Sequence, residues 1–196
     1  ELEKVPETVI SRCQTFLFKQ PNQAILNGFA LSVAKKEGAT LEPEAAELVA
    51  LLGDGSFRDA HGILEKVLSS TKDKKITREE VEAVTGAPKA ELVRDILMAL
   101  VEKNLEKGIK SIARAGEANV DMKLFAKLIL ERLRFLFLLR LKAGMDNYIA
   151  EQVSEDDFKF LKALASKAGT DLTADVLLSF ITAYEDAGRT SIPELA

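Results

Sequence analysis

The sequence predicts an all-α protein. Hydrophobic residues recur at helical spacing through most of the chain, and residues suited to capping helices stand where these segments begin. The 196 residues include only five prolines. With 47% hydrophobic and 30% charged residues, the composition is that of an ordinary globular protein long enough to bury a substantial core.

The composition also excludes several classes of function. A formal net charge of −4 argues against a chain that wraps nucleic acid by itself, so DNA contact would need a local patch or a partner. One cysteine excludes an intramolecular disulfide, and with a single histidine we expect no metal site. The most apolar run, 133–141, is far shorter than the roughly 20 residues of a membrane span, and we expect neither a membrane span nor a signal peptide. We therefore expect a cytoplasmic location without membrane contact.

The first twenty residues are expected to form a loop and one short strand, Thr15–Phe18. Pro6 fits a loop better than a central strand. Because a single strand is not stable alone, its sheet is expected in a preceding part of the protein. The chain also begins at Glu1 rather than Met, so we interpret it as a fragment of a longer protein.

Four helices are expected next, over 21–38, 43–53, 56–68 and 77–85. Spacing by four residues supports the first helix, and Pro43 suits the first turn of the second. Ser56 followed by Asp59 opens the third helix, and Thr77 with Glu80 forms a capping box for the fourth. The polar residues 69–76 between them are expected to form a loop.

Five more helices are expected over 88–100, 105–116, 121–143, 154–165 and 173–187. Pro88 suits position N1 of the first, Asp121 caps the third, and Ser154 with Asp157 opens the fourth. From Leu133 onward the third helix is apolar on nearly every side. Such a helix is either buried all round or lies at a subunit interface.

Arg12 and Arg58 are the two candidate site residues. Arg12 stands between Ser11 and Cys13, where a lone arginine is most simply solvated or locally ion-paired. Placed across an interface, its planar guanidinium could stabilise charge on a transferring phosphoryl group. Arg58 lies just inside the N-terminus of the helix opened by Ser56, where backbone N–H groups attract anions; the simpler interpretation is an ion pair with Asp54 or Asp59.

Other reactive residue types have structural explanations. Cys13 is expected to be a small buried residue, because one distant histidine and no acid support it as a nucleophile. His61 is expected to be a hydrogen-bonded core histidine at the buried edge of its helix. The acidic run 154–157 is interpreted as a helix cap with acidic first-turn residues.

The string from Lys4 to Phe16, with Ser11-Arg12-Cys13 at its centre, resembles the Ser-Arg-Cys segment of bacterial clamp-loader AAA+ ATPases. These are the gamma/tau and delta-prime subunits of DNA polymerase III. The string Gly55-Ser56-Phe57-Arg58-Asp59 is similar to the sensor-2 motif of the same family. The resemblance implies three parts: 1–19 as the end of the AAA+ core, 20–87 as its lid, and 88–196 as the helical collar that holds subunits together.

The resemblance also implies a function. A gamma/tau subunit would use ATP and Mg²⁺ in a hetero-pentamer with further gamma/tau, delta and delta-prime subunits, and this pentamer would open the sliding clamp and load it on primed DNA. Arg12 would be the arginine finger that acts on the neighbouring subunit, and Arg58 would be the sensor 2 of its own subunit, with Ser11, Cys13, Ser56 and Asp59 supporting the motifs.

The fragment contains no Gly-x-x-x-x-Gly-Lys-Ser/Thr phosphate loop, so we expect it to bind ATP weakly and not to hydrolyse it alone. Three alternatives remain open. The first is a delta-prime subunit, which keeps the Ser-Arg-Cys arginine. The second is another AAA+ protein with a helical oligomerisation domain, such as a replication-fork maintenance ATPase. The third is a helical scaffold without a nucleotide role, in which Arg12 and Arg58 would both be dispensable.

Overall fold

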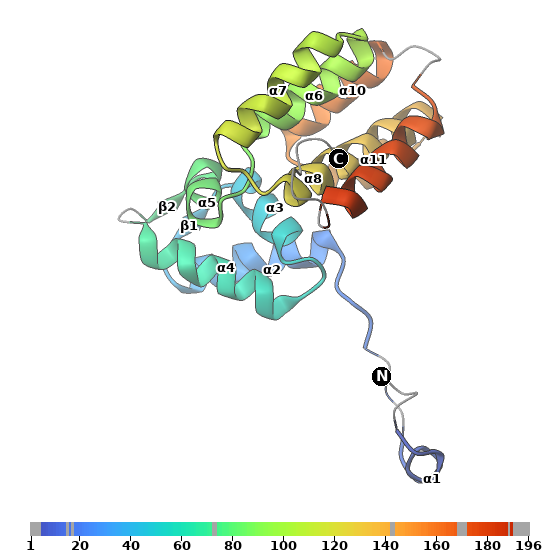
Figure 1. Cartoon of the computed structure of the whole chain (residues 1–196). Helices are drawn as coiled ribbons and strands as arrows, with labels where there is room; N and C mark the ends of the chain where they lie inside the picture. The colour runs from blue at the N-terminus through green and yellow to red at the C-terminus, as the bar shows by residue number, and fades with distance from the viewer. Residues whose placement is uncertain are drawn as a thin grey trace.

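The computed structural model describes residues 5–14, 16, 18–71, 74–141, 144–167, 172–187 and 189. This part of the chain is mostly helical, and all nine expected helices are present together with two short ones, α1 and α9 (Figure 1). The helices are α1 (Glu7–Ile10), α2 (Gln23–Lys36), α3 (Pro43–Leu52), α4 (Phe57–Ser70), α5 (Arg78–Thr85), α6 (Ala90–Glu102), α7 (Leu105–Glu117), α8 (Met122–Leu141), α9 (Asp146–Ala150), α10 (Glu155–Lys167) and α11 (Ala174–Ala187).

The expected helix starts are confirmed except at Pro88. The Ser56 hydroxyl accepts a hydrogen bond from the Asp59 N–H at 3.2 Å, and Thr77 with Glu80 forms a full capping box. The Asp121 carboxylate accepts from the Leu124 N–H at 3.0 Å. Pro88 lies outside α6, whose N-cap is Lys89, because the chain stays extended for one more residue before the helix begins.

Two short strands replace part of an expected loop. β1 (Thr40–Leu41) and β2 (Lys75–Ile76) pair in parallel, with Leu41 opposite Ile76. The loop expected over 69–76 is therefore wrong at both ends: Ser69 and Ser70 belong to α4, and 75–76 form β2. Each strand buries one apolar residue, Leu41 in β1 and Ile76 in β2. These side chains hold the two connections between helices against the core.

The strand expected over 15–18 is not seen in the residues that are described. Phe16 and Phe18 lie outside any strand and are 74% and 90% exposed, while Thr15 and Leu17 lie outside the described residues. The preceding segment forms α1, a single turn of helix without a buried residue. In Figure 1, α1 lies apart from all the other helices.

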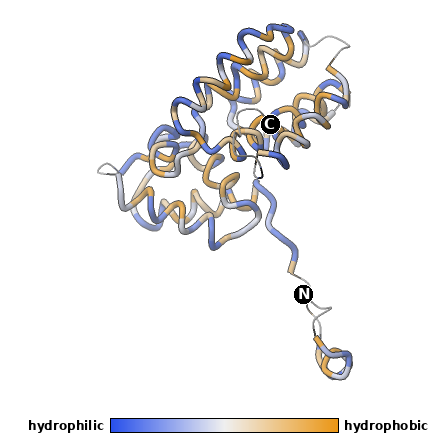
Figure 2. Tube along the Cα trace, viewed as in Figure 1, coloured by the Kyte–Doolittle hydropathy of each residue, from blue (hydrophilic) through white to orange (hydrophobic). Residues whose placement is uncertain are grey.

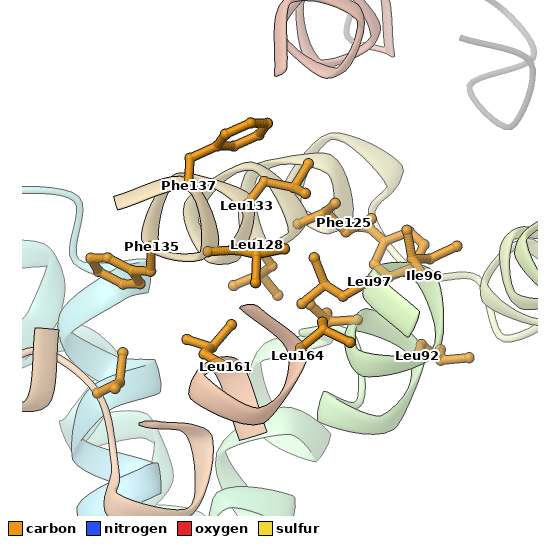
Figure 3. Close-up of a cluster of buried hydrophobic side chains, with 14 of the residues drawn as sticks. Leu92, Ile96, Leu97, Phe125, Leu128, Leu133, Phe135, Phe137, Leu161 and Leu164 are labelled. Atoms are coloured by element: carbon orange, nitrogen blue, oxygen red, sulfur yellow. The ribbon is translucent and has the colours of Figure 1, made fainter. Parts of the chain in front are cut away.

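The buried side chains form two hydrophobic cores. The first core is built from α2, α3, α4, α5 and the two strands, between Leu26 and Ala87. The second core is built mainly from α6, α8 and α10, between Leu92 and Leu172, and it also takes in Leu51 from the end of α3 (Figure 3). The boundaries at 19 and 87 stay a prediction.

Helix α8 is the central element of the second core. Its side chains Leu133, Phe135 and Leu136 have no exposed surface, and the helix packs against α6, α10 and α11. Figure 2 shows hydrophobic residues gathered where the helices face one another. The helix is thus buried on one side up to Phe137, whereas Arg134 is exposed and Leu141 at its end is 78% exposed, and an interface role for this helix stays a prediction. Among the helices of the described residues, none has the length and apolar character needed to span a bilayer.

Candidate functional site

Arg12 lies in an exposed turn that follows α1. Its backbone N–H donates to the Val9 carbonyl at 3.1 Å, and the Ser11 hydroxyl donates to the Thr8 carbonyl at 3.3 Å. Within the described part of the chain no ion pair involves the Arg12 guanidinium. The side chain is thus available to a group outside this chain. Cys13 is exposed too, so the expectation that it is buried is wrong: the adjoining helix α1 has no buried residue and supplies no core that could cover it.

Arg58 occupies the first turn of α4 and is also exposed. The ion pair considered for it does not form: Asp54 pairs instead with Lys127 of α8, with 2.7 Å between Nζ and Oδ1. Asp59, in the same turn, is exposed and donates its backbone N–H to Ser56. An exposed cation at a helix N-terminus is an arrangement that suits an anion.

The turn that presents Arg58 has a tightly defined shape. Gly53 ends α3 so close to α4 that a Cβ atom there would lie 2.7 Å from the Cβ of Ala60. Only glycine allows this approach. Asp54 and Gly55 then adopt φ angles of 46° and 79°, a left-handed region that both residue types tolerate. The position of Arg58 therefore follows from the position of α3.

An aromatic cluster lies beside this turn. The rings of Phe29 in α2 and Phe57 in α4 meet edge to face, with centroids 5.1 Å apart, and the imidazole of His61 lies 6.3 Å from the Phe29 ring. His61 is exposed, so its expected place in the core is wrong: the helix turns it toward solvent, while Ala60 and Leu64 fill the core instead.

The most extensive polar structure in the described residues is one that local sequence patterns did not predict. We call Glu47, Arg94, Arg132 and Asp157 the buried ion cluster. Arg132 of α8 bonds both Glu47 of α3 and Asp157 of α10, the latter at 3.0 Å, and Arg94 of α6 contacts Asp157 at 2.5 Å. Glu47, Arg132 and Asp157 are 4%, 7% and 5% exposed.

Ser154 hydrogen-bonds the Glu47 carboxylate and the backbone of Asp157. Its backbone N–H donates to Glu47 Oε2 at 2.8 Å, and its hydroxyl accepts from the Asp157 N–H at 3.3 Å. The capping role expected of Ser154 is thus confirmed, but Asp157 is a buried ion-pair partner as well as a first-turn acid. Buried charges persist only when they are paired and hydrogen-bonded in this way.

Contacts within the cluster change the pKa values of Asp157 and Arg132. Burial by itself raises the pKa of the Asp157 carboxyl, but the charge of Arg132 and the hydrogen bond and charge of Arg94 together lower it below its ordinary value. Burial likewise opposes the charge of Arg132, but Glu47 and Asp157 raise its pKa. A lowered carboxyl pKa stabilises the fold above the ordinary aspartate range, and this stabilisation is lost as the pH falls through the folded-state pKa.

A second buried carboxylate, Glu131, titrates in the opposite direction. Burial raises the pKa of Glu131, although Arg132, Arg134 and a hydrogen bond from Gln23 oppose that rise. Its Oε2 atom and the Oδ1 atom of Asn27 are both buried without a hydrogen-bond partner among the described residues. For Glu131, a buried carboxylate oxygen without a hydrogen-bond donor destabilises the ionised form.

Glu131→Gln is therefore expected to increase the free energy of unfolding at pH 7. In the wild type, the raised pKa of Glu131 contributes to the free energy of unfolding. The whole contribution is present below the ordinary carboxyl value of 4.5, and it is lost as the pH rises through the folded-state pKa. The free energy of unfolding of the variant should fall less over this pH range, because an amide stays neutral. Urea unfolding at a series of pH values measures this, with Glu65→Gln on the exposed face of α4 as the matched control; equal pH slopes for wild type and Glu131→Gln would contradict it.

No group of three or more His, Cys, Asp or Glu side chains is arranged to bind a metal ion within the described ranges. Arg12 and Arg58 are not brought together, because α1 lies apart from α4 (Figure 1). If both act on nucleotide, they must act on different molecules of it.

Comparison with known proteins shows which proteins the chain resembles. The chain is 24% identical over 161 residues to DNA polymerase III subunit tau of Bacillus subtilis, which covers 82% of this chain and 28% of that protein. It is 28% identical over 135 residues to DNA polymerase III subunit gamma of Buchnera aphidicola subsp. Baizongia pistaciae, covering 69% of this chain and 35% of that protein. The chain resembles DNA polymerase III gamma/tau subunits over most of its length. That confirms the resemblance found in its motifs.

The chain is also similar to proteins with other names. Protein STICHEL-like 1 of Arabidopsis thaliana is 28% identical over 155 residues, covering 79% of this chain and 13% of that protein. The solved structure of the Bacillus subtilis DNA clamp loader delta protein aligns over 98% of this chain and 59% of its own, with 16% identity and a TM-score of 0.47. No family model matches the chain. The gamma/tau-like chain spans about a third or less of the length of these curated relatives.

Proposed function

We propose that this chain is the lid and collar of a clamp-loader subunit of the DNA polymerase III gamma/tau type. The subunit would use ATP to open a sliding clamp and load it on primed DNA, in a cytoplasmic hetero-pentamer with gamma/tau, delta and delta-prime subunits. The observation that carries the proposal is the exposed, unpaired Arg58 in the first turn of a Ser56-capped helix, within a chain that resembles gamma/tau subunits.

The first turn of α4 fits the phosphates of ATP. The Ser56 side chain uses the Asp59 N–H, and the N–H groups of Phe57 and Arg58 have no partner inside the helix. These groups and the helix dipole favour an anion, and the guanidinium of Arg58 adds a full positive charge. The carboxylate of Asp59 opposes this, so the side chain of Arg58 is the deciding group. Magnesium would be held by ATP and the rest of the subunit.

Arg12 suits a role on a different subunit. It is exposed, it has no ion-pair partner among the described residues, and α1 stands away from the helices that carry Arg58 (Figure 1). A guanidinium in such a position could reach the ATP of a neighbouring subunit and stabilise the charge of the transferring phosphoryl group. In this proposal the second core forms the collar, which would bring the neighbours together.

Arg58→Ala in the full-length protein tests the proposal. We expect the ATP concentration that gives half-maximal clamp binding to rise about tenfold, as for the loss of a charge-assisted hydrogen bond to phosphate. The readout is clamp binding titrated against ATP in the assembled loader. Lys66→Ala, which removes an exposed cation from the same helix, should bind as the wild type does. Wild-type clamp affinity of Arg58→Ala at every ATP concentration would instead favour a helical scaffold without a nucleotide role.

A further inference from the structure

Single side-chain contacts join α3 and the turn after it to α8. Glu47, Leu51 and Asp54 are spaced by four and three residues, so they follow one side of α3 and the turn beyond it. Glu47 contacts Arg132, Leu51 packs into the second core, and Asp54 pairs with Lys127. All three contacts of this side of α3 are therefore made with the second core.

Helix α8 supplies the matching face. Leu124, Lys127 and Glu131 are spaced by three and four residues, and Arg132 follows directly. Leu124 packs against the first core, and Glu131 accepts a hydrogen bond from Gln23 of α2. Leu51 thus packs into the second core, and Leu124 packs against the first core. The ion pairs Glu47–Arg132 and Asp54–Lys127 join the same two parts of the chain.

The buried ion cluster fixes the relative position of the two helices. Arg132 joins Glu47, from the first core, to Asp157, from the second. Each carboxylate has a further anchor: Ser154 donates to Glu47, and Arg94 holds Asp157. A rotation of α3 against α8 would leave Glu47 buried without its cation, an arrangement that proteins avoid.

The shape of the α3–α4 turn determines where Arg58 lies relative to α3. α3 ends where Gly53 touches Ala60 of α4, and Asp54 in the turn is held by Lys127. Because α4 begins at Phe57, only the short turn 53–56 separates α3 from the helix that carries Arg58. Arg58 and the helices of the second core must consequently move together.

We propose that Glu47 and Arg132 are positioning residues for Arg58, which lock the two cores into one rigid body. This inference rests on the proposed role of Arg58 in sensing ATP. In this proposal, an anion bound at Arg58 shifts α4. Because α3 cannot rotate against α8, the helices α6, α8 and α10 move together with α4. The ion cluster would thereby join the nucleotide response to the collar.

Two variants separate this role from stability alone. Glu47→Gln and Asp157→Asn each remove one carboxylate from Arg132, but only Glu47 connects the two cores, since Asp157 lies in the second core with Arg94. A first experiment needs no nucleotide. Spin labels are attached through a genetically encoded keto amino acid at the exposed Ser70 and Lys110 of the full-length protein, and pulsed electron paramagnetic resonance measures their separation. Glu47→Gln should broaden the distance distribution, and Asp157→Asn should leave it narrow.

A second experiment measures ATP dependence in the assembled loader. Glu47→Gln should raise the ATP concentration for half-maximal clamp binding by about fivefold or more, within the usual range of coupling between sites, and Asp157→Asn should not. Equal shifts for the two variants, or a narrow distance distribution for Glu47→Gln, would overturn the inference. If only Arg58→Ala shifts the ATP dependence, the proposed function stands and this inference fails. If Arg58→Ala has no effect, the proposed function fails, and the distances alone then decide whether the cores are locked.

Should Glu47→Gln not fold, Glu47→Asp provides the same test. It keeps the negative charge, so Arg132 is not left without a counter-charge, but its carboxylate is one methylene shorter and cannot hold Arg132 in the same position. A broadened distance distribution supports the inference, and an unchanged one overturns it.

Discussion

Arg12→Ala in the full-length protein is expected to slow DNA-stimulated ATP hydrolysis by the assembled loader by about 10³–10⁵-fold, the known effect of removing an arginine finger. ATP binding should stay nearly intact, because the ATP that Arg12 serves would lie in the neighbouring subunit. Stability should also be unchanged, since Arg12 is exposed and α1 buries no residue. Steady-state turnover and a nucleotide-binding titration on the same preparation measure the two quantities.

Two controls make the result for Arg12 specific. Lys19→Ala removes another exposed cation from the same segment and should turn over ATP as the wild type does. Arg12→Lys keeps the positive charge but not the planar fork of donors, and it should remain largely inactive. Unchanged hydrolysis in Arg12→Ala would exclude the finger role.

Arg132→Ala is expected to lower the free energy of unfolding by about 3–5 kcal/mol, the usual effect of breaking a buried ion pair. The loss is large because Glu47 and Asp157 would both stay buried, and Glu47 would lose its only ion-pair partner in the described residues. Urea unfolding near neutral pH measures it, with the transition followed by circular dichroism.

Arg134→Ala is the matched control for Arg132→Ala. Arg134 lies two residues further along α8, its side chain is 48% exposed, and its ion pair with Glu131 is 3.7 Å long. Removing such a surface pair should change stability by about 0.5 kcal/mol or less. Similar losses for the two variants would contradict a special contribution of the buried ion pairs of Arg132.

The helical fold could be predicted because its signals are local. Helical spacing and caps such as Ser56, Thr77 and Asp121 involve residues three or four apart, and the structure confirms them. The elements that were missed have no such signal. β1 and β2 are two residues each, too short for any periodicity, and their pairing joins Thr40 to Lys75 across the first core.

The candidate site could be predicted only in part, for the same reason. The position of Arg58 in the first turn of its helix could be predicted because the helix cap is local. Asp54, one of the two ion-pair partners considered for Arg58, instead pairs with Lys127 from a distant helix. Arg132 looks like a polar interruption in a leucine-rich helix. Its partners Glu47 and Asp157 lie 85 and 25 residues away in sequence, so only the packing of α3, α8 and α10 reveals them.

The order of the two cores along the chain also bears on how the protein is made. The first core is complete by Ala87, whereas Arg132 follows Glu47 by 85 residues. At the usual rates of translation, about 5–20 residues per second, that interval lasts roughly 4 to 17 s. During it the side of α3 that carries Leu51 has no partner, and the charged, hydrated Glu47 beside it disfavours contact with other apolar surfaces. A residue that locks the finished protein would thus also protect the nascent one from aggregation.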